Sequence, residues 1–256
     1  MNWVERLFDY PYPLRTALGK RIRRYRSSYS REHYYYCIRT AAETAVALGV
    51  SRISVLEFGV AGGNGLLEIE RICAALAAGG GIGFEIYGFD TGAGLPPPED
   101  YRDLPYQWQE GFFAMDVPAL RRRLKTAALV VGNVRETVPA FVAKAAHAPI
   151  GAVMFDLDYY SSTVDALGVF ASDRPENHLP RVPCYFDDIG AIPSVGVGLA
   201  VAEFNAAHPM MKVENPLALR YRREYRDWGW KVFEMHHFVH PDYATPVVKD
   251  DQLPLV

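Results

Sequence analysis

The chain has 256 residues, of which 50% are hydrophobic and 22% charged, and its formal net charge is −3. This composition suits one domain with a buried core and excludes a disordered chain, because apolar content is high and net charge is low. Three cysteines exclude a disulfide-based scaffold, and no run of about 18 apolar residues predicts a membrane span. The N-terminus lacks the apolar core of a secretory signal, so we expect a cytoplasmic protein with reduced thiols.

Residues 1–49 are expected to form an N-terminal helical cap or lid, which ends in a helix over 32–48 with an apolar side. The stretch 15–39 within it holds eight basic residues against a single acid, and tyrosines are interspersed. Such a stretch can bind nucleic acid or another anion, although an exposed helix with a partly buried tyrosine face is the simpler interpretation. The mildly acidic remainder of the chain argues against a dedicated nucleic-acid-binding protein.

Short apolar runs alternate with helical segments from residue 50 onward. The runs have the length of buried strands and lie at Ile53–Phe58, Phe84–Phe89, Ala127–Val131, Ala152–Leu157 and Val182–Phe186. Helices are expected near 64–78, 116–125, 135–146, 162–172 and 195–207. This alternation predicts an α/β fold with a doubly wound, mostly parallel sheet that is covered by helices on both faces.

Two further strands are predicted at Leu217–Arg222 and Trp230–Val239, as an antiparallel hairpin at the edge of the sheet. The α/β domain is therefore expected to span 50–240, and the tail 241–256 is expected to be irregular. Ligands of open α/β sheets bind beyond the carboxyl ends of the strands, near the point where the strand order reverses. The residues that follow each predicted strand are therefore the candidates for function.

A glycine-rich turn follows the first strand, with the sequence EFGVAGGNG over 57–65. Glycines let the backbone approach a ligand closely, and Asn64 can cap a helix whose first amides would face an anion. The dinucleotide pattern GxGxxG is absent, which makes an NAD-dependent dehydrogenase the weakest candidate. The acid at the strand end, Glu57, suits a cationic or hydroxyl-bearing ligand. A tight strand-to-helix turn without a ligand explains the pattern equally well.

An acid also follows the second strand, where Asp90 is placed to accept hydrogen bonds from ribose hydroxyls. The segment 91–115 comes next and is long and rich in proline and aromatic residues, as lids and binding loops are. Its side chains Trp108, Phe112 and Phe113 are expected either to close over a ligand or to anchor the loop by packing.

The ends of the last three parallel strands carry an amide and two acidic pairs. Asn133 follows the third strand, where an amide suits a purine ring, although an ordinary helix start explains it better. Four aspartates follow the next two strands, at 156, 158, 187 and 188. Carboxylates gathered on one side repel each other unless a cation or a shared proton compensates, and oxygen ligands in this number suit Mg²⁺. Ordinary polar loop starts and helix caps are the alternative for each pair.

Taken in order, these segments resemble the macrocin O-methyltransferase-like family of class I methyltransferases that use S-adenosylmethionine (SAM). The resemblance covers about 50–205, and its motifs are EFGV at 57–60, DTGAGLP at 90–96, WQEGFF at 108–113, GNVRETVP at 132–139, DLDYYSST at 156–163, DDIG at 187–190 and AVAEF at 200–204. Residues 1–49 and 206–256 match poorly, and these regions would shape the acceptor site.

The resemblance implies a Rossmann-like fold with SAM across the first strands and Mg²⁺ beside it. The cofactor-binding residues that it implies are Glu57, Gly59 and Gly63 at the methionine end, Asp90 at the ribose, Asn133 and Val134 at the adenine, and Thr91 and Asp156 beside them. Asp158, Asp187 and Asp188 would bind Mg²⁺, which would hold an acceptor hydroxyl and lower its pKa. Asp158 would also accept the proton as the catalytic residue.

The sequence therefore predicts a SAM- and Mg²⁺-dependent O-methyltransferase of a sugar or another small polyhydroxylated acceptor. A metal-dependent glycosyltransferase is the second candidate, because Asp156-Leu157-Asp158 is a DxD motif of the kind that holds a metal and a nucleotide-sugar diphosphate. A non-catalytic protein of the same fold, which binds polyanions through 15–39, is the third. The sequence is also compatible with a homo-oligomer.

Overall fold

The computed structural model describes residues 29–144, 146–171, 174–190, 193–222, 225 and 227–246. Six of the eight basic residues in the stretch 15–39 precede residue 29, so most of that stretch lies outside the described residues, as does the end of the expected tail. Within the described ranges, no helix is long and apolar enough to cross a membrane.

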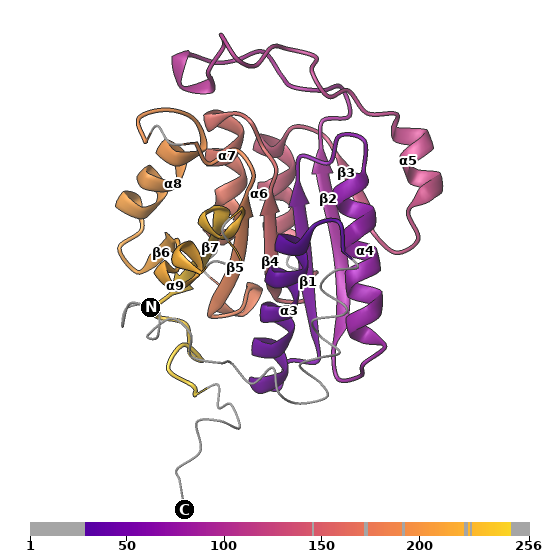
Figure 1. Ribbon diagram of the computed structural model, residues 1–256, viewed down its shortest axis with the longest axis vertical. Coiled ribbons are helices and arrows are strands. Elements are labelled where there is room, and N and C mark those ends of the chain that lie inside the picture. The colour runs from indigo at the N-terminus through magenta and orange to yellow at the C-terminus, as the bar shows by residue number, and fades with distance from the viewer. Residues whose placement is uncertain are drawn as a thin grey trace, which may run out of the picture.

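Seven strands form one sheet in the order β3-β2-β1-β4-β5-β7-β6 (Figure 1). They are β1 Arg52–Phe58, β2 Gly83–Asp90, β3 Ala128–Val131, β4 Ile150–Phe155, β5 Arg181–Phe186, β6 Met211–Glu214 and β7 Val232–His237. The first five are parallel, and β7 runs antiparallel to both β5 and β6. The predicted doubly wound, mostly parallel sheet with an antiparallel edge hairpin is confirmed.

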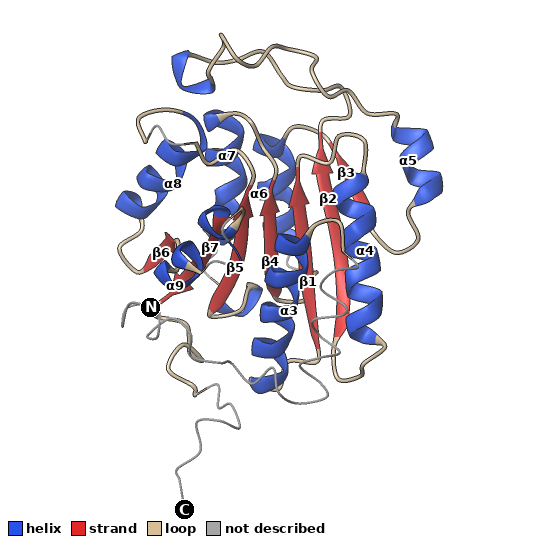
Figure 2. Ribbon diagram, in the orientation of Figure 1, coloured by secondary structure: helices blue, strands red, loops and turns tan. Residues whose placement is uncertain are grey.

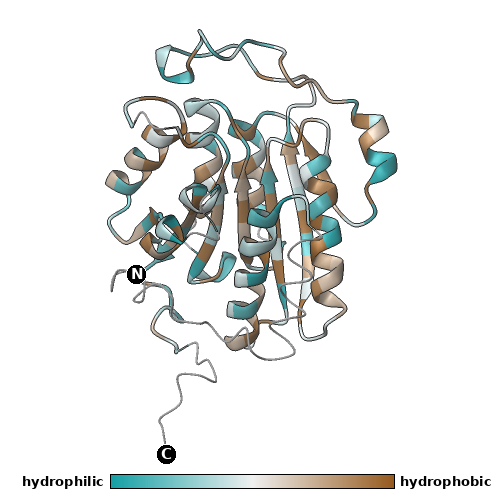
Figure 3. Cartoon of the chain, viewed as in Figure 1, coloured by the Kyte–Doolittle hydropathy of each residue, from teal (hydrophilic) through white to brown (hydrophobic). Residues whose placement is uncertain are grey.

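Helices cover both faces of this sheet (Figure 2). They are α3 Glu32–Ala47, α4 Asn64–Ala77, α5 Val117–Arg123, α6 Val134–Lys144, α7 Tyr160–Leu167, α8 Gly196–Ala207 and α9 Leu217–Tyr221. The helices α3 and α4 pack together on one face, whereas α6, α7 and α8 follow one another on the other. The central strands β1 and β4 are therefore buried on both sides, which explains the continuous apolar sequence of β4 and the predominantly apolar sequence of β1 (Figure 3).

The prediction of a strand at Leu217–Arg222 is wrong. This segment forms the short helix α9, which begins directly after Pro216, whose φ of −63° already suits a helix start. The edge strand that pairs with β7 is instead β6, which begins six residues before the predicted strand. The Asn205 side chain of α8 fastens β6 in place, because it donates to the carbonyl of Val213 at 2.9 Å and accepts from the Val213 amide at 2.7 Å.

Four phenylalanines form a row across the sheet just below the carboxyl ends of its strands. Phe58 of β1 stacks on Phe89 of β2 and on Phe155 of β4, with ring centroids 4.7 and 5.4 Å away. Phe155 stacks in turn on Phe186 of β5 at 4.6 Å. All four rings are buried, and they are partners in the strand register. Because each strand leaves the sheet at this row, the residues that follow it must emerge side by side.

A buried histidine near the opposite end of the sheet predicts acid sensitivity of the fold. Burial lowers the pKa of His178 to about 4, and the rings of His237 and His240 lie 5.0 and 6.1 Å away. The unfolded chain takes up this proton below pH 6.5, so the free energy of unfolding should fall by about 3 kcal/mol as the pH falls from 6.5 to 4. Urea unfolding across this range should show a weaker pH dependence for His178→Asn than for the wild type; equal dependence would contradict the assignment.

Candidate active site

A cavity of about 390 Å³ opens beyond the row of phenylalanines, where β1 lies between β2 and β4 and the strand order reverses. Its lining includes the residues that directly follow four strands or end them, namely Gly59, Asp90, Asp156 and Asp187. This is the place where open α/β sheets bind ligands, and the volume is typical of a small-molecule site. The strand-end prediction of the site's location therefore agrees with the geometry.

The glycine turn after β1 lies against the backbone that follows β4. Gly59 has a φ of +82°, and a Cβ there would lie 1.9 Å from the carbonyl oxygen of Asp156. A side chain is therefore excluded both by conformation and by space. Gly63 also has a positive φ, of +83°, but it packs against Leu120 of α5 and is not among the described residues that line the cavity.

The carboxylate of Asp90 holds this turn in place. Its Oδ2 accepts hydrogen bonds from the amides of Val60 and Ala61, both at 2.9 Å, and its Oδ1 accepts from the amide of Gly92 at 2.7 Å. A carboxylate oxygen can accept two hydrogen bonds, so Oδ1 retains capacity for a ligand hydroxyl. Asp90 thus shapes the turn and faces the cavity at the same time.

Glu57, the last acid of β1, is buried with one oxygen unpaired. Its Oε1 accepts from the hydroxyl of Tyr34 at 2.9 Å, whereas its Oε2 has no hydrogen-bond partner. Gly65 approaches so closely that a Cβ there would lie 1.8 Å from Oε1. Burial, followed by the nearby charge of Asp156, raises the pKa of Glu57 to about 8. A buried carboxyl group with a free acceptor oxygen suits a cationic or hydrogen-bond-donating ligand.

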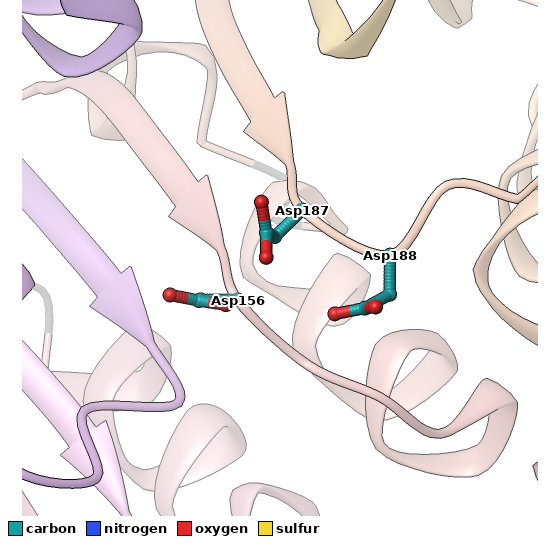
Figure 4. A group of neighbouring side chains, drawn as sticks. All are labelled: Asp156, Asp187 and Asp188. Atoms are coloured by element: carbon teal, nitrogen blue, oxygen red, sulfur yellow. The ribbon is translucent and has the colours of Figure 1, made fainter. Parts of the chain in front are cut away.

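Three aspartates from β4 and β5 converge on the other side of the cavity (Figure 4). One oxygen from each of Asp156, Asp187 and Asp188 lies within 4.8 Å of the other two. The pKa of Asp156 is raised, and that of Asp188 is raised to about 6, in each case by burial and then by the charge of Asp187. A divalent cation would relieve this repulsion, so the donor set fits a hard metal ion.

Asp187 is held ionised by two donors. Its Oδ1 accepts from the hydroxyl of Tyr185 at 2.5 Å and from the ammonium of Lys231 at 3.0 Å. Although burial acts to raise the pKa of Asp187, these two contacts bring it below its ordinary value. Both donors use Oδ1, which leaves Oδ2 available as an acceptor.

Asp158 lies beside this cluster and not within it. It lines the cavity, and burial followed by the charge of Asp188 raises its pKa to about 7. The sequence placed Asp158, Asp187 and Asp188 together as metal ligands, whereas the three mutually close oxygens come from Asp156, Asp187 and Asp188. Asp156 therefore joins the pair after β5, and the charge of Asp188 acts on Asp158 beside the cluster.

The residues expected at the adenine and ribose also border the cavity, but their oxygens have local partners. Asn133 Oδ1 accepts from the amide of Arg135 at 2.9 Å, so it caps the start of α6, as the simpler interpretation held. Val134 beside it is buried and apolar. Thr91 donates its hydroxyl to the carbonyl of Gly94 at 2.6 Å. All three residues line the cavity.

The segment 91–115 projects beyond the carboxyl ends of the strands between β2 and α5 (Figure 1). Trp108 and Phe113 line the cavity, whereas Phe112 is not among the described lining residues. The segment is tied down by Asp103, which is fully buried and accepts hydrogen bonds from the amides of Glu99 and Ser161, both at 2.8 Å.

Replacing Asp103 by alanine is expected to loosen this segment. The change leaves buried amides without acceptors, which costs about 1–3 kcal/mol for each unsatisfied group. Amide hydrogen exchange over 95–113 should become faster, while Glu110→Ala, an exposed change in the same segment, should leave it unaltered. Unchanged protection in the Asp103 variant would show that the segment is held by other contacts.

Arg31 of the N-terminal region lines the cavity, and Tyr34 contacts both Arg31 and Glu57; the sequence analysis did not identify either residue. Arg31 lines the cavity, and its Nη1 lies 3.0 Å from the hydroxyl of Tyr34 and 3.4 Å from Oδ2 of Asp156. The basic, tyrosine-rich composition of 15–39 was the available signal. Composition alone does not show which of these side chains points toward the cavity, because that depends on how α3 packs against β4 and β5.

No protein-family model matches the chain, and no curated protein sequence matches it. Among solved structures, the chain is similar to the calicheamicin methyltransferase CalS11, with a TM-score of 0.58 and 21% identity over 91% of this chain and 89% of that one. An apo structure of CalS11, described as a TDP-rhamnose 3'-O-methyltransferase, gives a TM-score of 0.46 and 20% identity over 90% and 89% of the two chains. An O-methyltransferase from Bacillus cereus in complex with SAH gives 0.40 and 12% over 80% of each chain. The first similarity establishes a class I methyltransferase fold.

Proposed function

We propose that the protein is a SAM-dependent O-methyltransferase that acts, with Mg²⁺, on a hydroxyl group of a sugar or another small polyhydroxylated acceptor. One observation carries the proposal: a single cavity at the strand-order reversal has the glycine turn and Asp90 on one side and three converging carboxylates on the other. The methyltransferase fold supports this assignment. The name of the CalS11 neighbour makes a sugar hydroxyl the first acceptor to examine.

The cofactor half of the cavity fits the chemistry of SAM. The positive ammonium of a methionyl group would donate a hydrogen bond to Oε2 of Glu57, which has no partner. The free acceptor capacity on Oδ1 of Asp90 would take a ribose hydroxyl, and Asn133 and Val134 would border the adenine. The absence of a Cβ at Gly59 lets the backbone approach the ligand.

The metal half fits a divalent cation through Asp156, Asp187 and Asp188, with Asp158 beside them. When bound, the ion supplies a Lewis acid that lowers the pKa of an acceptor hydroxyl. Lys231 and Tyr185 both donate to Oδ1 of Asp187, hold it ionised, and leave its second oxygen available to an ion. Asp158, with a pKa of about 7, is suited to accept the hydroxyl proton near neutral pH.

The aromatic side chains of the segment 91–115 would cover the reactants. Trp108 and Phe113 line the cavity, and their apolar rings would exclude water. Methyl transfer requires an in-line approach of the acceptor oxygen, so holding both reactants in place supplies much of the rate. A glycosyltransferase using the DxD motif has less support, because the described aspartates whose oxygens gather within 4.8 Å of one another are Asp156, Asp187 and Asp188, and the group does not include Asp158.

The test is transfer of a labelled methyl group from SAM to a panel of acceptors that includes sugars, amino sugars and nucleotide-linked sugars. We expect product from a hydroxylated acceptor, its loss when EDTA removes divalent ions, and its recovery when Mg²⁺ is restored. Transfer that persists unchanged in EDTA would contradict the metal part of the proposal. Consumption of a nucleotide-linked sugar without SAM would favour the glycosyltransferase.

A further inference from the structure

A lysine contacts the carboxylate cluster without being part of the described cavity wall. The ammonium of Lys231 lies 3.0 Å from Oδ1 of Asp187, and only 22% of the lysine side chain is exposed. Asp187 is among the described residues that line the cavity, whereas Lys231 is not. The ammonium is therefore placed to act on the carboxylates of the cluster and not on an acceptor in the cavity.

The fold holds Lys231 in this position. The antiparallel register pairs Val232 of β7 with Tyr185 near the end of β5, so the residue before Val232 lies where β5 leaves the sheet. The Asn215 side chain donates to the carbonyls of Gly229 and Val232, at 3.0 and 2.6 Å, and so fastens the backbone on both sides of the lysine. The ammonium also lies 6.0 Å from the centre of the Tyr185 ring. The charge of Lys231 is therefore a built-in feature of the site.

This lysine compensates part of the charge that a divalent cation needs. The cluster consists of Asp156, Asp187 and Asp188, and Lys231 pairs with the second of them. The guanidinium of Arg31 contacts Asp156 at a longer distance of 3.4 Å, and no described residue forms an ion pair with Asp188. A divalent cation bound by the cluster would share Asp187 with an ammonium group, and the two positive charges would repel each other.

We propose that Lys231 is an internal counter-ion that competes with the divalent cation for Asp187 and keeps the affinity of the site for that cation low. The inference rests on the metal part of the proposed function, and it adds a control on metal binding at the same site. Low affinity lets the ion exchange with solvent between turnovers, so that it is not a permanent part of the protein.

A supporting role for Lys231 predicts the opposite effect on metal binding. If the lysine served only to hold Asp187 in place, removing its charge would disorder a metal ligand and weaken the binding of the ion. If the lysine competes with the ion, removing its charge strengthens binding, because the repulsion is lost. The sign of the change in affinity therefore distinguishes the two roles.

Titration with Mn²⁺, followed by electron paramagnetic resonance of the free ion, measures this affinity without relying on activity. Lys231→Met, which keeps the length of the side chain but removes its charge, is expected to bind Mn²⁺ about tenfold more tightly or better. Lys231→Arg, which keeps the charge, should stay within about threefold of the wild type. The affinity for S-adenosylhomocysteine (SAH) should change by less than about twofold in both variants.

Two further variants serve as controls. Tyr185→Phe removes the other donor to Oδ1 of Asp187 but no charge, so it should change Mn²⁺ affinity by less than about threefold. Lys212→Met removes the same charge as Lys231→Met, but from β6, where Lys212 donates to the carbonyl of Asn205 outside the described cavity lining. Its Mn²⁺ affinity should equal that of the wild type.

The outcomes separate this inference from the proposed function. Weaker Mn²⁺ binding by Lys231→Met, or an affinity within about threefold of the wild type, overturns the inference while the metal site stands. If neither the wild type nor Lys231→Met binds Mn²⁺ at millimolar concentration, the metal part of the proposed function fails too. Thermal melting shows whether each variant is folded. Lys231→Gln, which keeps a hydrogen-bond donor without the charge, gives the same test if the methionine variant is not folded.

Discussion

Replacing Asp187 by asparagine is expected to lower Mg²⁺-dependent methyl transfer at least about 100-fold while leaving SAH binding within about twofold of the wild type. Asp187 is the cluster member that its neighbours keep ionised, through Tyr185 and Lys231. Asparagine keeps the size of the side chain but removes the negative charge that a divalent cation requires. The substitution should therefore lower the rate of metal-dependent transfer and leave the affinity for the cofactor unchanged.

Two measurements check this expectation. Binding of Mn²⁺, as a spectroscopic substitute for Mg²⁺, should weaken in parallel with the transfer rate. Asp165→Asn is the matched control, because it removes the same charge from a residue that pairs with Arg135 outside the described cavity lining. Full metal-dependent activity in the Asp187 variant would show that the ion binds elsewhere or is not used.

Replacing Gly59 by alanine is expected to lower the free energy of unfolding by about 3 kcal/mol or more. The new Cβ would lie 1.9 Å from the Asp156 carbonyl oxygen, in a backbone conformation with a φ of +82°. Either the turn or the segment after β4 must move, and both line the cavity. SAH binding should be lost together with stability.

Gly62 in the same turn provides the control. A Cβ at Gly62 meets no atom within 4 Å, and its φ lies outside the left-handed region. Gly62→Ala should therefore unfold at nearly the wild-type urea midpoint. Equal midpoints for the two variants would mean that the turn after β1 adjusts freely and that its close approach to β4 is not a constraint.

The two central strands were predictable because burial on both faces selects for mostly apolar runs. All six residues of β4 are buried, and so are six of the seven in β1. The apolar run at 217–219 led to the wrong prediction of a strand, because a short apolar run suits a strand and a helix equally. In the structure Leu219 is buried as part of α9. Two features favour the helix there: Pro216 directly precedes it, and the hydrogen bonds of Asn205 in α8 hold β6 as the strand beside β7.

The position of the cavity was predictable from topology, but which residues gather in it was not. Parallel strands bring their carboxyl ends to one edge, so Glu57, Asp90 and the aspartate pairs had to meet there. Which aspartate after β4 points toward Asp187 depends on how the chain leaves the strand, and alternation alone does not distinguish Asp156 from Asp158. Arg31 was missed because its place depends on the packing of a helix that precedes the sheet.

The central claim is that this cavity binds the SAM cofactor, and calorimetric titration of the folded protein with SAH tests it most directly. Performed with and without Mg²⁺, the titration is expected to give a micromolar dissociation constant in the wild type. Asp90→Ala should weaken binding at least tenfold, about 1.4 kcal/mol, because it removes the proposed ribose acceptor and loosens the turn. Absence of SAH binding by wild-type protein that melts cooperatively would contradict the account.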